Sequence, residues 1–302
     1  MKTHQMKTAK ETPANETSSD AVKEPGEHSS APYLDRPQLD RSHYDRIEAT
    51  FDIAEQTLAV AHELDAAPPA EPLRKTDLDV SIVIPVYNER NTVVEIVRRV
   101  QAVGIHKEIV LVDDFSVDGT RKILLELERE PDIHVILHGY NRGKGAALRT
   151  AFAQATGDVV MIQDADLEYN PNDLPKLLEA IEAGADVVYG SRFLENAREN
   201  DPSRLHRFGN WALTTASNAI TGQRLTDMET CYKVFRREVL EQVQIEQERF
   251  GFEPEITAKL SHLGYQIEEL PISYNARDYE AGKKIGFKDA LNALFCIAKY
   301  RK

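Results

Sequence analysis

Three acidic residues alternate in the segment QDADLEYNP, which covers residues 163–171: Asp164, Asp166 and Glu168. The apolar run DVVMI precedes them, so the acids follow a predicted buried strand. Packed carboxylates repel one another, and this arrangement predicts a bound cation. Mg²⁺ is usually held by one or two carboxylates together with substrate phosphates. We therefore expect Asp164 and Asp166 to form half of a Mg²⁺ or Mn²⁺ site that a diphosphate completes, with Glu168 as a third candidate ligand. The alternative is a solvated acidic turn.

A glycine-rich segment, NRGKGAALR at residues 141–149, is the second candidate for phosphate chemistry. It does not match the P-loop template, because Gly145 follows Lys144 where that template requires Ser or Thr. No G-x-G-x-x-G follows the first predicted strand either, so nucleotide hydrolysis and nicotinamide chemistry fit poorly. We expect Gly143 and Gly145 to form a tight turn with close backbone approach, and Lys144 to face donor phosphates.

The elements that position these residues alternate between strands and helices from Val80 onward. This order predicts an α/β fold with a mostly parallel sheet, whose ligands lie at the carboxyl ends of the strands. Strands are expected in VSIVIPVY, EIVLVDD, IHVILHG, DVVMIQDAD, ADVVYGSR, CYKVF and YQIEELPISY, and helices at 91–103, 117–130, 144–156, 174–184, 206–221, 254–263 and 287–300. The polar groups at the strand ends are Tyr87-Asn88-Glu89, Asp113-Asp114, Asp164-Ala165-Asp166 and Gly190-Ser191-Arg192.

The N-terminal quarter of the chain has a different composition. Residues 1–35 are rich in Thr, Ser, Glu and Pro, which predicts a disordered tail. Residues 36–66 carry apolar residues at spacings of three and four, which predicts an amphipathic helix. A Pro-rich linker at 67–78 then leads into one domain at 79–302. The helix is expected either to pack on that domain or to self-associate through residues 38–65.

Composition limits the classes of function. The net charge of −13 argues against nucleic-acid binding. The two cysteines, Cys231 and Cys296, show no metal-ligand spacing, which favours a reducing, cytoplasmic setting. No apolar run reaches the roughly 18 residues of a membrane-spanning helix, and the N-terminus lacks the apolar core of a secretory signal.

Seven segments together resemble one family: VSIVIPVYNERNTV, EIVLVDDFSVDGT, NRGKGAALRTAF, MIQDADLEYNP, VYGSRF, DMETCYKVFRREVL and ISYNARDYEAGKKIG. Their order is similar to that of family 2 glycosyltransferases, and most similar to that of the dolichyl-phosphate mannose and glucose synthases. The resemblance covers about residues 79–290. It implies a GT-A fold, an α/β/α sandwich that binds a nucleotide sugar.

The resemblance also implies roles for individual residues. The base and ribose would lie among Pro85, Tyr87, Glu89, Val112 and Asp114, and the donor and its metal beside Asp164, Ala165 and Asp166, with Glu168 standing where many relatives have Gln. The donor diphosphate or the acceptor phosphate would meet Arg192, Arg277 and Lys284, with Lys283 adjoining. Asp227 would either cap the adjoining strand or turn or point to the acceptor. Glu253 and Glu255 are expected to begin a helix, and His206 to lie on the surface.

The function expected is inverting transfer of a hexose from a nucleotide diphosphate sugar, of the GDP-mannose or UDP-glucose class, to a polyprenyl or dolichyl phosphate. One alternative is transfer to a polysaccharide hydroxyl, which needs a base such as Asp227 or Glu253. Another is nucleotide-sugar binding without turnover.

A lipid acceptor requires contact with a membrane surface, so a peripheral position on the cytoplasmic face is expected. In the last helix, Leu291 and Leu294 are expected to pack on the domain, and Lys299, Arg301 and Lys302 to face lipid.

Overall fold

The computed structural model describes residues 76–194, 204–276 and 287–301. The tail, the amphipathic helix and most of the linker predicted before residue 76 lie outside these ranges. Arg277, Lys283 and Lys284 do too, so their predicted phosphate contacts remain predictions.

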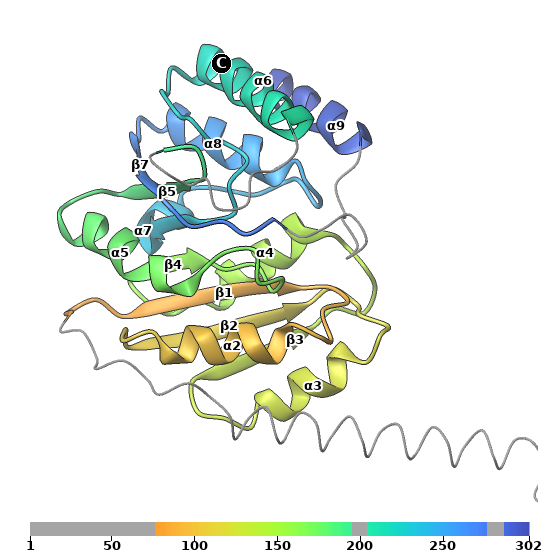
Figure 1. The fold of residues 1–302 in the computed structure, drawn as a ribbon. Helices are drawn as coiled ribbons and strands as arrows, with labels where there is room; N and C mark the ends of the chain where they lie inside the picture. The colour runs from red at the N-terminus through yellow and green to blue at the C-terminus, as the bar shows by residue number, and fades with distance from the viewer. Residues whose placement is uncertain (1–75, 195–203, 277–286, 302) are drawn as a thin grey trace, which may run out of the picture. The chain divides into compact units, whose positions relative to one another are not determined.

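The described residues form a seven-stranded sheet of order β3-β2-β1-β4-β6-β5-β7 (Figure 1). Six strands run parallel, and β6 is antiparallel to both of its neighbours. This confirms the α/β fold with a mostly parallel sheet. The strands are β1 (Val80–Val86), β2 (Lys107–Asp113), β3 (Ile133–Leu137), β4 (Val159–Ile162), β5 (Val187–Ser191), β6 (Lys233–Arg236) and β7 (Ile267–Pro271).

Helices connect the strands close to the predicted positions. They are α2 (Val93–Ala102), α3 (Thr120–Leu127), α4 (Lys144–Gln154), α5 (Leu174–Glu182), α6 (Arg204–Thr221), α7 (Arg237–Glu241), α8 (Phe252–His262) and α9 (Phe287–Lys299), with a 3-10 turn η1 (Pro171–Asp173). The short α7 and η1 were not predicted from the sequence. Each spans a single turn or so, too little for a hydrophobic period to show.

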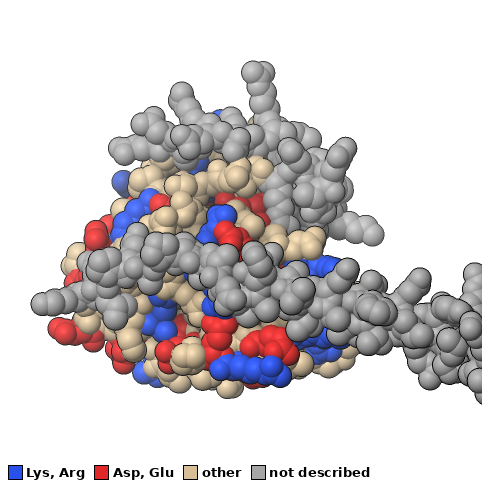
Figure 2. Space-filling model, turned by 60° about the horizontal axis from the view of Figure 1, so that its bottom comes forward, with Lys and Arg blue, Asp and Glu red and all other residues tan. Residues whose placement is uncertain are grey.

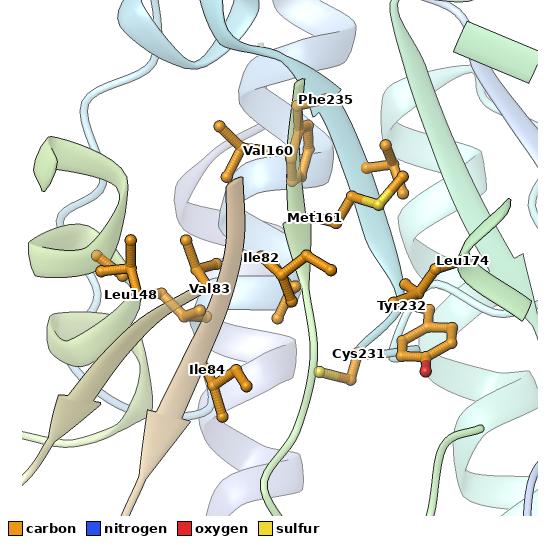
Figure 3. Packing of buried hydrophobic residues seen from close by; sticks show 14 of the residues in the cluster. Ile82, Val83, Ile84, Leu148, Val160, Met161, Leu174, Cys231, Tyr232 and Phe235 are labelled. Atoms are coloured by element: carbon orange, nitrogen blue, oxygen red, sulfur yellow. The ribbon is translucent and has the colours of Figure 1, made fainter. Parts of the chain in front are cut away.

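The core explains why β1 and β4 are continuous apolar runs. Helices cover both faces of the parallel part of the sheet, so side chains on alternate faces are all buried. Figure 3 shows Val83 beside Leu148 of α4, while Ile82 points to the other side of β1. Cys231 and Cys296 are both free and buried.

The last helix packs differently from the prediction. Ile297 joins the main core and Cys296 is fully buried, but Leu294 is 47% exposed and Phe295 is 61% exposed. The prediction that Leu294 packs on the domain is therefore wrong, because the buried stripe of α9 runs through Ala293, Cys296 and Ile297 instead. The side chain of Leu291 lies outside the described part. Figure 1 shows α6, α8 and α9 together beyond the β5–β7 side of the sheet.

The surface carries mixed charge. On the face shown in Figure 2, Lys and Arg side chains are interspersed with Asp and Glu side chains. That face therefore presents neighbouring charges of opposite sign rather than a field of one sign.

Candidate active site

The carboxyl ends of β1, β2 and β4 carry unusual backbone conformations. Asn88, Phe115 and Leu167 follow these three strands and have φ of 54°, 67° and 63°. Non-glycine residues rarely adopt positive φ, and such strain concentrates at functional sites. The same edge also receives the segment before β6, because an antiparallel strand begins where its parallel neighbours end. The loop from Asp227 to Tyr232 therefore lies at the same edge as the carboxyl ends of the parallel strands, where the sequence predicts the site.

The acidic segment forms a compact turn after β4. Asp166 accepts a hydrogen bond from the backbone N–H of Glu168, with an N···O distance of 3.2 Å. Gln163 is fully buried, and its side-chain oxygen accepts a hydrogen bond from the Tyr232 hydroxyl at 2.6 Å. The side chain of Asp164 is 18% exposed, so it is partly accessible to solvent at the carboxyl edge of the sheet. Ala165 is buried.

Lys144 lies against this turn. Its Nζ is 3.0 Å and 3.3 Å from the two carboxylate oxygens of Asp164, and 3.6 Å from Oε1 of Glu253. Burial by itself lowers the pKa of this ammonium, but the carboxylates, Asp164 first, outweigh burial and hold the pKa well above its usual range. Lys144 is therefore protonated and contributes a positive charge beside the acids.

The prediction of close backbone approach at the glycines is confirmed. A Cβ on Gly143 would stand 2.4 Å from the carbonyl oxygen of Glu248, and one on Gly145 would stand 2.4 Å from that of Gln247. Gly143 also has φ of 100°, which other residues rarely adopt.

The predicted base and ribose residues lie around the ends of β1 and β2. Pro85 and Val112 are partners in the pairing of these strands, and Tyr87 follows β1 with 37% exposure. Glu89 is buried at the start of α2, where its carboxylate accepts a hydrogen bond from Thr92 Oγ1 at 2.8 Å. A direct ligand contact by any of them remains a prediction.

Asp114 has a structural task that the sequence did not reveal. Its carboxylate accepts hydrogen bonds from the backbone N–H groups of Arg142 at 2.8 Å and Gly143 at 2.6 Å, and lies 2.8 Å from His138 Nδ1. This carboxylate ties the start of α4, and so Lys144, to the end of β2. The buried His138 was not among the predicted residues, because nothing in IHVILHG distinguishes it from a surface histidine.

Arg192 and Asp227 form a buried, bidentate ion pair. Nε and Nη2 of Arg192 donate to the two oxygens of Asp227 at 2.6 Å and 2.8 Å, and the backbone N–H of Arg192 donates at 3.1 Å. Asp227 is fully buried, and the Arg192 side chain is 15% exposed. Both were predicted at the site, but their pairing was not, because 35 residues separate them in sequence.

The segment after β7 runs along the acidic turn. The backbone N–H of Asn275 donates to the Glu168 carbonyl at 2.8 Å, and the Tyr274 hydroxyl donates to the Glu168 carboxylate at 2.7 Å. Arg192 also lies over the Tyr274 ring, with Cζ 5.1 Å from its centroid. The described chain after β7 therefore runs beside the acidic turn as far as Asn275.

Three ionisable side chains, Glu229, Lys233 and Glu253, were missed as site residues or weighed in another role. Lys233 is fully buried and donates to the carbonyls of Met228 and Thr230, which fixes the loop before β6. Glu229 has one buried oxygen without a hydrogen-bond partner among the described residues, and so has Glu253. Burial, with the nearby Glu253 charge, raises the pKa of Glu229 to about 8. Glu253 was weighed at the sequence level as a helix-starting acid, and α8 does begin at Phe252.

The donor set fits a divalent cation held with phosphates. Asp164 and Asp166 supply hard carboxylate oxygens on one turn, and Lys144 shows that Asp164 already holds a positive charge. No three His, Cys, Asp or Glu side chains gather as a ready-made cage within the described ranges. Glu168 accepts the Tyr274 hydrogen bond, and the metal contacts of Asp164, Asp166 and Glu168 remain predictions.

Comparison with known proteins agrees with this geometry. The model of the glycosyl transferase family 2 matches residues 81–244, more than half of the chain. The chain belongs to this family.

Two relatives of this family member have informative names. Dolichol-phosphate mannosyltransferase of Pyrococcus furiosus is 32% identical over 204 residues, which are 66% of the chain and 57% of that protein. Polyprenol monophosphomannose synthase of Mycolicibacterium smegmatis is 32% identical over 228 residues, 72% of the chain and 85% of that protein. The chain thus spans little more than half the length of the first relative.

Solved structures support the fold. Glucosyl-3-phosphoglycerate synthase from Mycobacterium tuberculosis, in complex with Mn²⁺, UDP-glucose and phosphoglyceric acid, matches with a TM-score of 0.56 and 18% identity. The match covers 74% of this chain and 80% of that one. The fold is GT-A, as predicted. Among the described residues, none of the helices combines the length and the apolar character needed to cross a bilayer.

Proposed function

We propose that this chain transfers a hexose from a nucleotide diphosphate sugar to a polyprenyl phosphate, with inversion at the anomeric carbon. The observation that carries the proposal is the meeting of opposite charges at one sheet edge. The acidic turn after β4 lies beside Lys144, and the Arg192–Asp227 pair and Tyr274 adjoin it. Both relatives are named for mannose and a dolichol or polyprenol phosphate, which supports this class of acceptor.

The donor side of the proposal uses Asp164, Asp166 and Lys144. A divalent cation bound by the two aspartates would neutralise charge on the departing nucleotide diphosphate. Lys144 is the first residue of α4, and we propose that it approaches the same phosphates. Arg192, fixed over Tyr274, offers a planar guanidinium suited to a phosphate group. Arg277 and Lys284 are proposed to meet the acceptor phosphate, and their segment follows Tyr274 and Asn275, which contact Glu168.

A phosphate acceptor removes the need for a strong base. A phosphate monoester has a second pKa of about 6 and is already an anion at neutral pH. Transfer to a sugar hydroxyl would need a free carboxylate instead. Asp227 is poorly suited to that role, because both of its oxygens accept hydrogen bonds from Arg192. This arrangement argues against Asp227 as the base that a hydroxyl acceptor would need.

The acceptor lipid requires a membrane-facing surface, which we assign to exposed apolar side chains of α6 and α9. Phe208 and Trp211 of α6 are 63% and 61% exposed, and their ring centroids lie 5.7 Å apart. Leu294 and Phe295 are exposed on α9, which packs against α6. Aromatic residues favour the interface between lipid and water. The basic end of α9 contributes less to this membrane-facing surface than the sequence predicts, since Lys299 forms an ion pair with Glu246 at 2.9 Å.

The surface is continuous with the site. The Phe193 ring lies under two guanidinium groups: Arg192 Cζ is 5.6 Å from its centroid, and Arg207 Cζ is 5.9 Å. Arg207 precedes Phe208 on α6, so this ring links the phosphate-facing Arg192 to the aromatic pair. We propose peripheral attachment to the cytoplasmic face of a membrane, which suits the two buried free thiols.

The deciding experiment offers the pure protein a choice of substrates. A panel including GDP-mannose and UDP-glucose is incubated with Mg²⁺ or Mn²⁺ and a short, water-soluble polyprenyl phosphate, and products are detected by mass spectrometry. We expect one lipid-linked phosphosugar, and NMR should show a β linkage from an α-linked donor. Transfer only to oligosaccharide hydroxyls, or nucleotide binding without any product, would refute the proposal.

Membrane contact is tested separately with acceptor in vesicles. The Phe208→Ser/Trp211→Ser variant should sediment less with anionic vesicles, while its transfer to the short acceptor should persist. Leu294→Ser and Leu125→Ser form a matched pair, because their side chains are equally exposed, 47% and 46%, on α9 and α3. Only Leu294→Ser should weaken sedimentation. Equal sedimentation of all variants would overturn the surface without touching the proposed reaction.

A further inference from the structure

The Lys144 ammonium lies between two carboxylates, those of Asp164 and Glu253, at unequal distances. It is 3.0 Å and 3.3 Å from the two oxygens of Asp164, so it spans the carboxylate that is the predicted metal ligand. It is 3.6 Å from Oε1 of Glu253, a looser contact. The second oxygen of Glu253 is buried and has no hydrogen-bond partner among the described residues.

A buried, half-satisfied carboxylate is costly unless another state satisfies it. Glu253 is only 4% exposed, so water cannot readily replace the missing partner. It adjoins a long, flexible ammonium that carries three donors. A shift of the Lys144 side chain toward Glu253 would engage Glu253 more fully and uncover the oxygens of Asp164.

The backbones on both sides of this pair are fixed. Gly143 and Gly145, which flank Lys144, are in tight approach to the carbonyls of Glu248 and Gln247. The segment that contains those carbonyls is in turn held by Glu255, whose carboxylate accepts the N–H groups of Glu246 and Gln247 at 2.7 Å and 2.8 Å. Glu253 and Glu255 are on the same turn of α8, so the hydrogen bonds of Glu255 also hold the backbone of Glu253 in place. The side chain of Lys144 can therefore move between the carboxylates while both backbones stay where they are.

A divalent cation and this ammonium compete for the same oxygens. Mg²⁺ binds carboxylate oxygen at about 2.1 Å. Both positive charges cannot occupy the face of Asp164, so the ammonium must leave when a cation enters. We propose that Glu253 is a positioning residue that receives the Lys144 ammonium, and that this transfer clears Asp164 for the divalent cation. The inference deepens the proposed function and rests on its metal-dependent donor site.

The test is a double-mutant cycle on Mn²⁺ affinity. Free Mn²⁺ is measured by electron paramagnetic resonance, with UDP or GDP and without, for the wild type, Lys144→Gln, Glu253→Gln and the double variant. We expect Lys144→Gln to bind Mn²⁺ at least five-fold more tightly, because the competing charge is gone. Glu253→Gln should bind at least five-fold more weakly, because the ammonium keeps to Asp164. The double variant should match Lys144→Gln within two-fold.

The cycle separates the relay from a simple effect of charge. If Glu253→Gln weakens binding as much without Lys144 as with it, Glu253 acts directly on the cation and the relay is wrong. The relay also fails if Glu253→Gln changes nothing. Glu229→Gln is the control, since Glu229 lies near Glu253 and also has one buried oxygen without a hydrogen-bond partner among the described residues; this variant should change Mn²⁺ affinity less than two-fold.

Folding is checked by circular dichroism and thermal melting of each variant. If Glu253→Gln does not fold, Glu253→Asp withdraws the carboxylate by one methylene and should also weaken Mn²⁺ binding. Additive effects with clear Mn²⁺ binding would overturn the relay and leave the proposed transferase intact. A wild type that binds no Mn²⁺ with either nucleotide would overturn both the relay and the metal-dependent donor site.

Discussion

Replacement of Asp227 by asparagine tests how far the site depends on its buried ion pair. Asn keeps the size of the side chain but removes its charge and one of the two acceptor oxygens. In the wild type, this carboxylate accepts three hydrogen bonds from Arg192, two from the guanidinium and one from the backbone. The variant leaves a guanidinium that is 15% exposed without its partner.

The expected cost follows from the burial of both partners. Breaking a buried pair by removing one partner costs about 3–5 kcal/mol, because the remaining charge stays desolvated. A domain has a total free energy of unfolding of about 5–15 kcal/mol, so the loss is a large fraction of it. For a domain of this size, each kcal/mol changes the melting temperature by about 2–4 °C. A fall of roughly 6–20 °C is therefore expected.

The assay is urea unfolding at neutral pH, supported by thermal melting. Asp186→Asn is the matched control, because its pair with Arg236 is longer, at 3.7 Å, and Asp186 is 48% exposed. That exposed pair should contribute less than about 1 kcal/mol. Asp227→Asn within 1 kcal/mol of the control would refute the reasoning. If the variant folds at low temperature, its turnover should fall more than its nucleotide affinity, since Arg192 loses its fixed orientation.

Three further changes test other parts of the molecule. Asp166→Ala should abolish transfer without lowering the melting temperature, and full activity at zero metal would exclude its ligand role. Glu229→Gln should raise stability by a few kcal/mol near pH 8 and by nothing near pH 4. The pKa of Glu229 is raised from about 4.5 in the unfolded chain to about 8 in the folded protein, so its contribution to the free energy of unfolding falls as pH rises between these values. Urea unfolding at several pH values would detect this difference between the wild type and the variant. Phe51→Glu/Leu58→Glu should reduce the mass measured by light scattering if residues 38–65 self-associate; an unchanged mass would exclude that.

The sequence was most informative where one element sets its own pattern. Runs such as VSIVIPVY are apolar throughout because both faces are covered, so strands and their ends could be located within a few residues. The glycines of NRGKGAALR were also interpreted correctly as positions of close backbone approach, although the carbonyls that they approach belong to Glu248 and Gln247, which are distant in sequence. The polar residues at the ends of β1, β2, β4 and β5 followed from the positions of these strands, whereas most of the other candidates followed from the family resemblance.

What the sequence could not reveal depends on contacts between distant segments. The antiparallel direction of β6 is set by its neighbours β4 and β5, and CYKVF is equally compatible with either direction. The pairing of Arg192 with Asp227 follows from that direction. The exposure of Leu294 depends on which stripe of α9 meets α8, since several apolar stripes compete on that helix.

The antiparallel β6 explains why so many charges can be buried at one edge. A parallel strand would have sent the segment before it to the opposite edge of the sheet. As an antiparallel strand, β6 instead places Asp227 opposite Arg192 and lets Lys233 hold the loop carbonyls of Met228 and Thr230. Buried pairs of this kind contribute little net stability compared with apolar packing. The value of the Arg192–Asp227 pair is geometric, because Arg192, which is proposed to meet a phosphate, is already oriented by Asp227 before any substrate binds. A substrate phosphate then meets a guanidinium that needs little reorganisation. Asp227→Asn is expected to remove this orientation and, because it leaves Arg192 unpaired, to lower the free energy of unfolding.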